Sequence, residues 1–512
     1  MAFWKQYYIK IILLSVLAGI LTAVAWQNTY LFPLQIIGFV PFLFAVLAVR
    51  KSSKSFLKKI LNLLLITFVF RGVALSLGLY WLFDVSVGAL IILVSTDVIL
   101  VSLILIPSLI RRVHFSIIVP LFILFEYLMQ NSLMLAPFYL MGYAWSIHIS
   151  LIQYYSLLGV EGGSLMIYLM NYAIFECIRI KRISKLNYAI FSIFILLTTY
   201  SIIKYYSVKD IEWDAEAKIS LLHSEINFST IEYVENPNIL VDEVQKVAAK
   251  NSLIVLPESF FTRLDWYEYL PKNKTIRYID SLNQVNNQQV LLGAMIYRPT
   301  NHPTPQSRVF EGRYYNTHNI SLLKDKRIHI KSKQVFIPFL EYIPSNAVAQ
   351  QINKWVPTVG DARKVNPMDI FDDFKYKDKR FNILLCYASI FPNIVTERSQ
   401  SSTFLTIQAN ENWHTSHTCS YQYLNINKAN TIQVGIPTYR SSNYGYTAFI
   451  KPNGDTEYLY KTGKPFSALV VPLPKRVSTS FYTKIAGYSY WLSGIGIGLL
   501  FLLGFLKINP KK

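Results

Sequence analysis

The sequence predicts an α-helical membrane bundle of about eight spans joined to an α/β domain outside the membrane. Of its 512 residues, 52% are hydrophobic and only 16% are charged, whereas soluble domains carry about 25% charged residues. The apolar residues concentrate in 1–204 and 484–506. The part between them, 205–480, has the composition of a soluble protein, and about 270 residues suffice to bury a full core. This uneven distribution favours two bodies over one soluble domain.

Long apolar runs divide the first part of the chain into spans, each of which needs about 20 predominantly apolar residues. The first run follows Lys5 and Lys10 without a clear small-residue cleavage site, so we expect a retained span and not a signal peptide. The stretch 133–154, with Pro137 and Gly142, is apolar but broken, which indicates an interfacial or re-entrant segment. The expected spans are 8–26, 31–49, 60–83, 88–110, 114–132, 155–178, 187–204 and 485–506.

Basic clusters between the spans predict the orientation of the chain. The net charge of +20 would also suit a nucleic-acid-binding protein, but the clusters separate apolar runs, so no nucleic acid is expected as a partner. If the spans alternate, every cluster falls on one side, which the positive-inside rule makes cytoplasmic. The α/β domain is then expected on the opposite side, outside the cytoplasm. The clusters are Arg50, Lys51, Lys54, Lys58 and Lys59; Arg111 and Arg112; Arg179, Lys181, Arg182 and Lys185; and Lys507, Lys511 and Lys512.

Ionisable residues also occur inside the expected spans. Arg71, Asp97 and Glu126 are the examples. A charged group in hydrocarbon is costly, so each is a functional group, part of an interhelical pair or a side chain that reaches the interface from a helix end. The sequence leaves these alternatives open.

The α/β domain is expected over 205–480, between a bundle of 1–204 and a last span with a basic tail over 481–512. Helix-like segments such as Ile239–Lys250 and Thr275–Val285 alternate with strand-like runs, which is typical of α/β domains. The strand-like runs are Lys218–Leu222, Leu253–Leu256, Val290–Ile296, Thr317–Leu323, Phe381–Tyr387, Thr403–Gln408, Ile432–Ile436, Tyr446–Lys451 and Phe466–Val471.

Three residues near the ends of strand-like runs could carry chemistry. Glu258 follows the run Leu253–Leu256 and could act as a general base. Lys333 lies two residues after Lys331, so both would face one side of an extended segment. Cys386 ends another apolar run, and a catalytic cysteine needs a thiolate, which a nearby lysine favours and a base can generate. Each alone has an ordinary explanation as a solvated, capping or core residue. Their combination indicates an active site.

Cysteines and histidines predict neither a disulfide scaffold nor a metal site. Cys177, Cys386 and Cys419 are too few for a disulfide framework. Cys386 and Cys419 could pair in an oxidising compartment, which the sequence leaves open. His414 and His417 are interpreted as incidental, and the chain has no phosphate-binding glycine loop. We therefore expect no cofactor and no metal.

The surroundings of the three candidate residues match a known pattern. Glu258 follows a proline, Lys333 precedes Glu341 by eight residues, and Cys386 is followed by Tyr387. In these features, and in the order of its spans, the chain resembles the apolipoprotein N-acyltransferases, the membrane branch of the nitrilase superfamily. Further segments that match are 338–344 (Pro-Phe-Leu-Glu-Tyr-Ile-Pro), 410–413 (Asn-Glu-Asn-Trp) and 440–445 (Arg-Ser-Ser-Asn-Tyr-Gly).

The resemblance implies a nitrilase-like αββα sandwich for the α/β domain and a set of roles. Glu258 would deprotonate Cys386, and Lys333 would stabilise the tetrahedral oxyanion. A fatty acyl chain would pass from a phospholipid, with phosphatidylethanolamine the expected donor, through a thioester to the N-terminal amine of a diacylglyceryl-cysteine lipoprotein. The supporting or substrate-binding residues that it implies are Glu341, Tyr387, Trp413, Arg440 and Asn443.

The chain also departs from the family pattern. Ala388 stands where the family usually has a glutamate, and Gln433 where it often has one. Segment 136–138 reads Ala-Pro-Phe in place of Phe-Pro-Trp. These changes leave open a membrane-anchored amidase or hydrolase, a diverged acyltransferase with a different acceptor, and an inactive scaffold. A transporter fits poorly, because it would give the large α/β domain no role.

Overall fold

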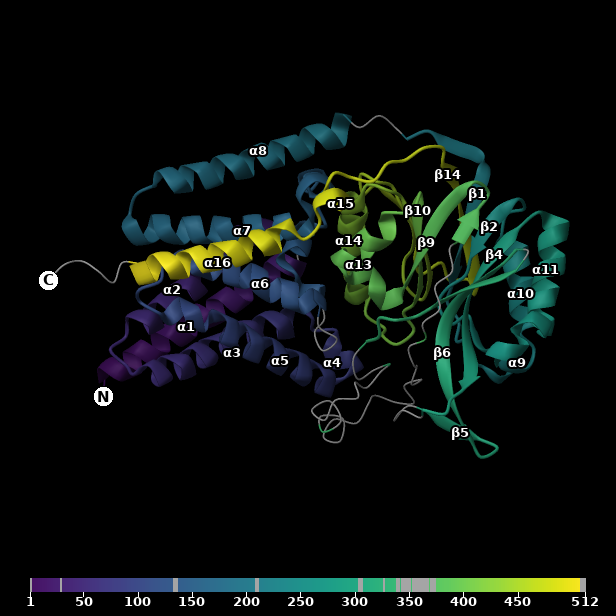
Figure 1. Cartoon of the computed structure of the whole chain (residues 1–512), viewed down its shortest axis with the longest axis horizontal. Coiled ribbons are helices and arrows are strands. Elements are labelled where there is room, and N and C mark those ends of the chain that lie inside the picture. Colours follow the sequence, from purple (N-terminus) through teal and green to yellow (C-terminus); the bar gives the residue numbers. More distant parts are fainter. Residues whose placement is uncertain are drawn as a thin grey trace. The chain divides into compact units, whose positions relative to one another are not determined.

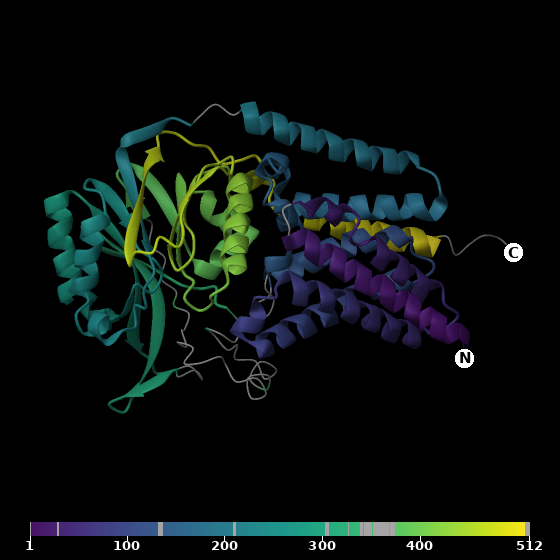
Figure 2. The same ribbon diagram turned by 180° about the vertical axis from the view of Figure 1, so that it is seen from behind.

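The computed structural model describes residues 2–27, 30–131, 137–207, 211–302, 307–325, 327–337, 341, 351, 368 and 374–506. The chain divides into two compact units (Figures 1 and 2). One comprises Met1–Ser207 with Lys484–Lys512, and the other comprises Val208–Thr483. The two units are described separately below.

The first unit is built from apolar helices, as the hydropathy predicts. Six segments in the described part of the chain are long and apolar enough to cross a membrane: Gln6–Gln27, Phe32–Lys51, Phe56–Gly78, Val87–Leu109, Tyr155–Ile180 and Lys185–Ser207. Shorter apolar helices occupy Phe115–Asn131 and Tyr488–Gly504, where the remaining spans were expected. The helices are α1 (Ala2–Gln27), α2 (Val40–Lys51), α3 (Phe56–Gly78), α4 (Leu82–Val85), α5 (Val87–Leu105), α6 (Ile118–Asn131), α7 (Tyr155–Ile180), α8 (Lys185–Ser207) and α16 (Tyr488–Leu506).

Polar side chains inside this unit connect its helices. Arg71 of α3 makes a two-pronged ion pair with Asp97 of α5, with both N–O distances at 2.7 Å. The interhelical-pair interpretation is therefore confirmed for these two residues. Glu126 of α6 accepts hydrogen bonds from the backbone of Met141 and the hydroxyl of Tyr168, each at 2.9 Å.

The broken stretch after α6 forms short 3₁₀ turns, η4 (Pro137–Tyr139), η5 (Met141–Trp145) and η6 (Ile149–Leu151). A Cβ at Gly142 would lie 2.1 Å from the carbonyl oxygen of Val160, so the turn and α7 approach too closely for any side chain.

The second unit is built on one continuous sheet that turns back on itself. Its order is β5-β6-β4-β2-β1-β11-β10-β9-β8. The junction is β1 (Trp213–Ser224), which runs parallel to β2 (Ser252–Val255) but meets β11 (Thr438–Asn443) only at His223 and Ser224. The other strands are β3 (Phe261–Trp266), β4 (Gln289–Pro299), β5 (Arg308–Phe310), β6 (Arg313–Lys324), β7 (Ile328–Ser332), β8 (Phe374–Tyr376), β9 (Lys379–Leu385), β10 (Phe404–Asn410), β12 (Thr447–Ile450), β13 (Thr456–Leu459) and β14 (Phe466–Pro474).

Alternation along these strands divides the core into three layers of side chains. The middle layer joins Ile219 and Leu253 from one half of the sheet to Phe381 and Phe404 from the other, so the halves pack face to face. One outer layer contains α10 (Asn238–Val247) and α11 (Lys274–Asn286), and the other is covered by α13 (Pro392–Ser399) and α14 (His417–Val434). The predicted fold class, a membrane-type helical bundle plus an αββα sandwich, is confirmed.

One expected strand is wrong. Ile432–Ile436 was expected to be extended, but Ile432 to Val434 form the last turn of α14. Ser416 caps the start of this helix with a side chain that accepts a hydrogen bond from the Cys419 backbone, and Gly435 in the left-handed conformation caps its end. Because the helix is buried on nearly all sides, its apolar end reads like a strand.

Candidate active site

Glu258 lies in a tight turn directly after β2. Ser259 next to it has a positive φ of 53°, which is uncommon for a residue with a side chain. A Cβ on Gly293 of β4 would lie 2.1 Å from the carbonyl oxygen of Pro257, so only glycine lets the turn cross this strand. The turn buries Glu258, which is 3% exposed, at the end of the strand.

Lys333 follows β7 and contacts two carboxylates. Its Nζ donates to Oε1 of Glu258 at 2.8 Å and to Oε1 of Glu341 at 2.7 Å. The lysine is 1% exposed, whereas the Glu341 side chain is 21% exposed. The backbone amide of Lys333 donates to the carbonyl oxygen of Asn319 at 2.7 Å, which fixes the lysine beside β6.

Burial and charge act in opposite directions in this group. Burial would lower the pKa of Lys333, but the carboxylates of Glu258 and Glu341 outweigh it and hold that pKa above its usual value. Burial also raises the pKa of Glu258, and Lys333 opposes this only partly because Glu341 adds a second negative charge. The lysine thus stays protonated, while Glu258 is a stronger base than an exposed glutamate.

Cys386 follows β9, where the chain enters the 3₁₀ turn η8 (Cys386–Ile390). Its φ of 46° lies in the left-handed region, a strained conformation for a non-glycine residue. Burial, followed by the charge of Glu258, raises the pKa of this thiol well above its usual value. Lys333 and the backbone amide of Asn410 act in the opposite direction. The resting thiol is therefore protonated and needs a base.

Glu258, Lys333, Glu341 and Cys386 together can perform nucleophilic chemistry. Glu258 accepts a hydrogen bond from the Cys386 thiol as well as from Lys333. A base, a nucleophile and a fixed ammonium thus share one buried place. This is the arrangement that covalent catalysis at a carbonyl carbon requires.

Sequence reasoning assigned no role to two asparagines in this cluster, although Asn410 begins the matching segment 410–413. Asn319 of β6 donates its side-chain amide to Oε1 of Glu258 at 2.8 Å. Asn410, at the end of β10, directs its backbone amide to the Cys386 sulfur. A polar residue within the apolar end of β6 was the available signal for Asn319. A backbone contact leaves no signal in the sequence.

Arg440 lies in a buried ion pair beside the cluster. Its guanidinium donates to Oε1 of Glu411, and its Nε donates to Oδ1 of Asn427 at 3.1 Å. Both charged side chains are 1% exposed. Asn427 in turn donates to the carbonyl oxygen of Ser389 at 3.2 Å, in the turn that begins at Cys386. Arg440 therefore supports the two segments that surround the cysteine.

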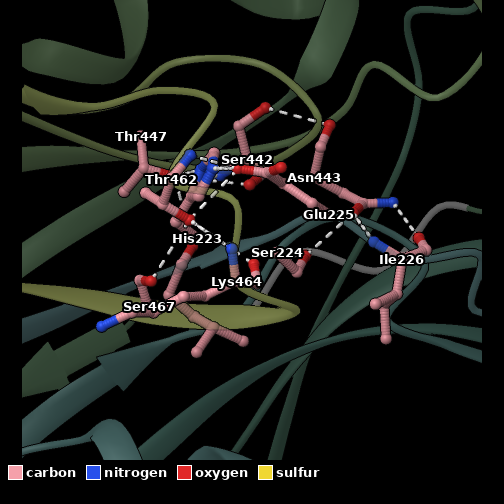
Figure 3. Close-up of polar contacts among 11 residues, drawn as sticks. His223, Ser224, Glu225, Ile226, Ser442, Asn443, Thr447, Thr462, Lys464 and Ser467 are labelled. Carbon is pink, nitrogen blue, oxygen red and sulfur yellow. Dashed lines mark hydrogen bonds and ion pairs between the residues drawn. The ribbon is translucent and has the colours of Figure 1, made fainter.

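Asn443 links the two halves of the sheet (Figure 3). Its Oδ1 accepts from Ser224 at 2.9 Å, and its Nδ2 donates to the carbonyl oxygen of Ile226 at 3.0 Å and to Oδ1 of Asn410 at 3.2 Å. In the same network, His223 contacts Thr447 and Glu225 at 3.2 and 3.1 Å. Asn443 thus reaches the cysteine through Asn410.

The remaining predicted residues lie around the same place. Tyr387 is buried, and its ring packs edge-on against Phe391 at 5.2 Å. Trp413 is half-buried in the loop after β10, with its ring 4.5 Å from that of His414. Their substrate-binding roles stay predictions.

Cysteine pairing and metal binding find no support in the described part of the chain. Cys177, Cys386 and Cys419 are free thiols. The described residues contain no group of three or more metal-ligating side chains. His417 contacts the hydroxyl of Tyr446 at 3.0 Å.

Sequence comparison shows which known proteins the chain resembles. Residues 18–173 match the family described as the apolipoprotein N-acyltransferase N-terminal domain. The chain is 23% identical to the apolipoprotein N-acyltransferase of Geobacter metallireducens in an alignment that covers 97% of this chain and 95% of that protein. The resemblance to the apolipoprotein N-acyltransferase family is confirmed. With its membrane-capable helices, the chain is a multi-pass membrane protein.

Other apolipoprotein N-acyltransferases align over shorter regions. The protein of Wigglesworthia glossinidia brevipalpis is 27% identical over 52% of this chain, and the alignment spans 51% of its own length. That of Rickettsia typhi is 23% identical, and the alignment covers 65% of each chain. Among solved structures, a mutant amidase from Nesterenkonia is 12% identical, with a TM-score of 0.36 over 56% of this chain and 99% of the amidase. A carbon-nitrogen hydrolase from Helicobacter pylori is 13% identical, with a TM-score of 0.33 over 50% and 87%.

The departures from the apolipoprotein N-acyltransferase pattern have structural counterparts. Ala388 lines a cavity of about 30 Å³ together with Lys331, Lys333 and Arg398. The missing glutamate therefore leaves space beside three cationic residues. Gln433 is buried and donates to Thr396 at 2.8 Å, which ties α14 to α13. In segment 136–138, Ala136 lies outside the described residues.

Proposed function

We propose that the chain is an N-acyltransferase that moves a fatty acyl group from a phospholipid, through a thioester on Cys386, to an amine. The observation that carries this proposal is the buried cluster in which Glu258 and Lys333 share a hydrogen bond of 2.8 Å beside the Cys386 thiol. The sequence likeness to apolipoprotein N-acyltransferases supports it.

In the first half-reaction, Glu258 takes the proton of the Cys386 thiol, and the sulfur attacks the ester carbonyl carbon of the lipid. Lys333 has three N–H donors, and its contacts with the two carboxylates are the ones that the described residues make; the third donor is directed to the developing oxyanion in this proposal. The carbon–oxygen bond then breaks, and the lysophospholipid oxygen leaves with the proton from Glu258.

In the second half-reaction, the incoming amine attacks the thioester. Glu258 accepts a proton from the attacking nitrogen, the carbon–sulfur bond breaks, and the sulfur regains a proton from Glu258. The products are an amide and the free thiol. Glu341, bound to Lys333 at 2.7 Å, orients the ammonium through both steps.

The substrates proposed follow from the family likeness. The donor is a phospholipid, with phosphatidylethanolamine expected, and the acceptor is the N-terminal amine of a diacylglyceryl-cysteine lipoprotein. Both remain in the bilayer, which explains why the enzyme has a membrane body. We place the protein in the inner membrane with its catalytic domain on the periplasmic side, which the basic clusters between the spans support.

Mass spectrometry of the purified full-length protein with phosphatidylethanolamine tests this proposal. We expect an acyl adduct on the wild type and none on Cys386→Ala. The control is Cys419→Ala, which removes the other buried thiol and should keep the adduct. Addition of a diacylglyceryl-cysteine peptide should move the acyl group to the peptide amine.

An adduct that only decays to free fatty acid would favour the hydrolase alternative. Transfer to another amine alone would favour a different acceptor, a change that Ala388 motivates. Absence of any adduct on wild type would contradict the thioester mechanism and support the scaffold alternative.

A further inference from the structure

A large hollow lies at one end of the helical unit. It has a volume of about 970 Å³ and is bordered by the ends of α2 and α7, by segment 111–115 and by Gly504 of α16. A Cβ on Gly504 would lie 3.0 Å from the carbonyl oxygen of Arg112, so the glycine lets α16 approach this segment closely.

Two arginines beside the hollow are held by backbone carbonyl groups. Arg50 donates to the carbonyl oxygens of Ser108 and Arg111 at 3.1 Å. Arg111 donates in return to those of Lys51 and Ser52 at 2.9 and 3.1 Å. Each guanidinium group is thus hydrogen-bonded to backbone carbonyl groups of the other arginine's segment. These bonds hold both groups in fixed positions. Such positive charges need no reorganisation when an anion arrives.

The charge around the hollow is not balanced. Five cationic residues border it, Arg50, Lys51, Arg111, Arg112 and Arg179, against the single carboxylate of Glu176. That carboxylate is already bound by Arg179 at 2.6 Å. Among the described residues, neither Arg50 nor Arg111 makes an ion pair with a carboxylate. The hollow therefore carries an excess of positive charge.

Apart from the exposed His114, the rest of the lining is apolar. Leu47, Val113 and Phe115 contribute it, and the two last are buried. The cations Lys51, Arg111 and Arg112 are exposed around them. A ligand that fits must join a negative group to an apolar part and must be available where membrane helices end. A phospholipid with a net negative head group has this chemistry.

We propose that this hollow binds the phosphodiester head group of an anionic phospholipid, such as phosphatidylglycerol, in the leaflet at this end of the bundle. The site is separate from the Glu258–Lys333–Cys386 cluster and does not depend on the proposed reaction. The charge of the basic loops then has a second role beyond setting membrane orientation.

Native mass spectrometry of the full-length protein in detergent, titrated with phosphatidylglycerol or phosphatidylethanolamine, tests the site. The variant Lys51→Gln/Arg112→Gln removes two exposed charges whose side chains make none of the hydrogen bonds described above. We expect it to bind phosphatidylglycerol about 30-fold more weakly, since each basic residue near a membrane surface contributes roughly a fivefold change in affinity. Binding of zwitterionic phosphatidylethanolamine should change little.

The matched control is Arg182→Gln/Lys185→Gln, which removes the same charge from exposed positions outside the hollow. It should keep the affinity of the wild type. Equal weakening in both variants would show a general charge effect and overturn the proposal. Inorganic phosphate forms the second arm: if it binds as tightly as the lipid and displaces it, the ligand is a soluble anion and the lipid site is contradicted.

Discussion

At the scale of single residues, Lys333 faces two carboxylates with one positive charge. Glu258 and Glu341 lie within 2.8 and 2.7 Å of its Nζ. Among the described residues of this cluster, negative charge therefore exceeds positive charge, and Glu341 raises the pKa of Glu258 in addition to the larger effect of burial. The proton affinity of the proposed base thus depends on Glu341.

Replacement of Glu341 by glutamine should move the acid limb of activity to lower pH. Activity requires unprotonated Glu258, so it falls as the pH drops through the pKa of this residue. Removing the negative charge of Glu341 lowers that pKa, because Glu341 is one of the groups that raise it. A pH profile of acyl transfer measures the shift, with the exposed Glu311→Gln as control. A limb that stays in place would contradict this electrostatic role.

Lys331 is a buried base in the neighbourhood of the site. Burial, followed by the charge of Arg398, lowers its pKa to about 7. The unfolded chain therefore binds more protons than the folded one between about pH 7 and pH 10.4, and stability rises with pH across this window. Below about pH 7, Lys331 is charged in the folded protein, and burial of this charge lowers the free energy of unfolding by its full amount.

Lys331→Met should consequently stabilise the protein most at low pH. We expect a gain of about 1–2 kcal/mol at pH 6 and little at pH 10, because the change also removes the hydrogen bond from Lys331 to Asn382 at 2.6 Å. Thermal unfolding at several pH values measures it, and the exposed Lys375→Met serves as control. A gain independent of pH would mean that packing, and not the charge, is responsible.

At the scale of elements, the pair Glu411–Arg440 ties the loop after β10 to β11. Burial would raise the pKa of Glu411, but Arg440 and hydrogen bonds outweigh it and lower the pKa to about 2. Its contribution to stability is present above the usual glutamate pKa of 4.5 and is lost as the pH falls from there to about 2.

Glu411→Gln should destabilise the protein by about 3–5 kcal/mol at neutral pH, because it leaves Arg440 buried without a counter-charge. The double variant with Arg440→Met should recover part of this loss, since no unpaired charge remains. Thermal unfolding of both variants and the wild type gives the coupling. Acyl transfer should fall as well, since this loop directly follows Asn410 at the end of β10. A single variant as stable as the wild type would contradict the importance of the pair.

Hydrophobic periodicity predicted the strands that are mainly apolar. Elements whose polar residues are buried by tertiary contacts were not predicted. The strands that precede Glu258 and Cys386 were expected, because both residues follow short and mainly apolar runs. The polar strand β11 was missed, since its buried Arg440 and Asn443 are satisfied by distant partners. The structure brings Glu258, Lys333, Glu341 and Cys386 together, but their catalytic roles stay predictions. Asn319 and Asn410 could not be found from spacing, because only the folded sheet brings them to the site.

At the scale of the whole molecule, hydropathy separates the chain into its two units, and charge predicts their sides. The helical unit comprises Met1–Ser207 and Lys484–Lys512, so the polypeptide leaves it and returns to it once. The division into two units does not by itself determine on which side of the membrane the second unit lies. The side of the second unit therefore rests on the basic loops.

Cysteine labelling of intact cells tests this orientation. In a Cys177→Ala background, in which the remaining cysteines are buried, Lys272→Cys reports on the second unit and Arg182→Cys on the loop between α7 and α8. Both positions are exposed in the structure. A maleimide that passes the outer but not the inner membrane should label Lys272→Cys in intact cells, and Arg182→Cys only after lysis. The reverse pattern would put the second unit in the cytoplasm, on the wrong side for the proposed lipoprotein acceptor.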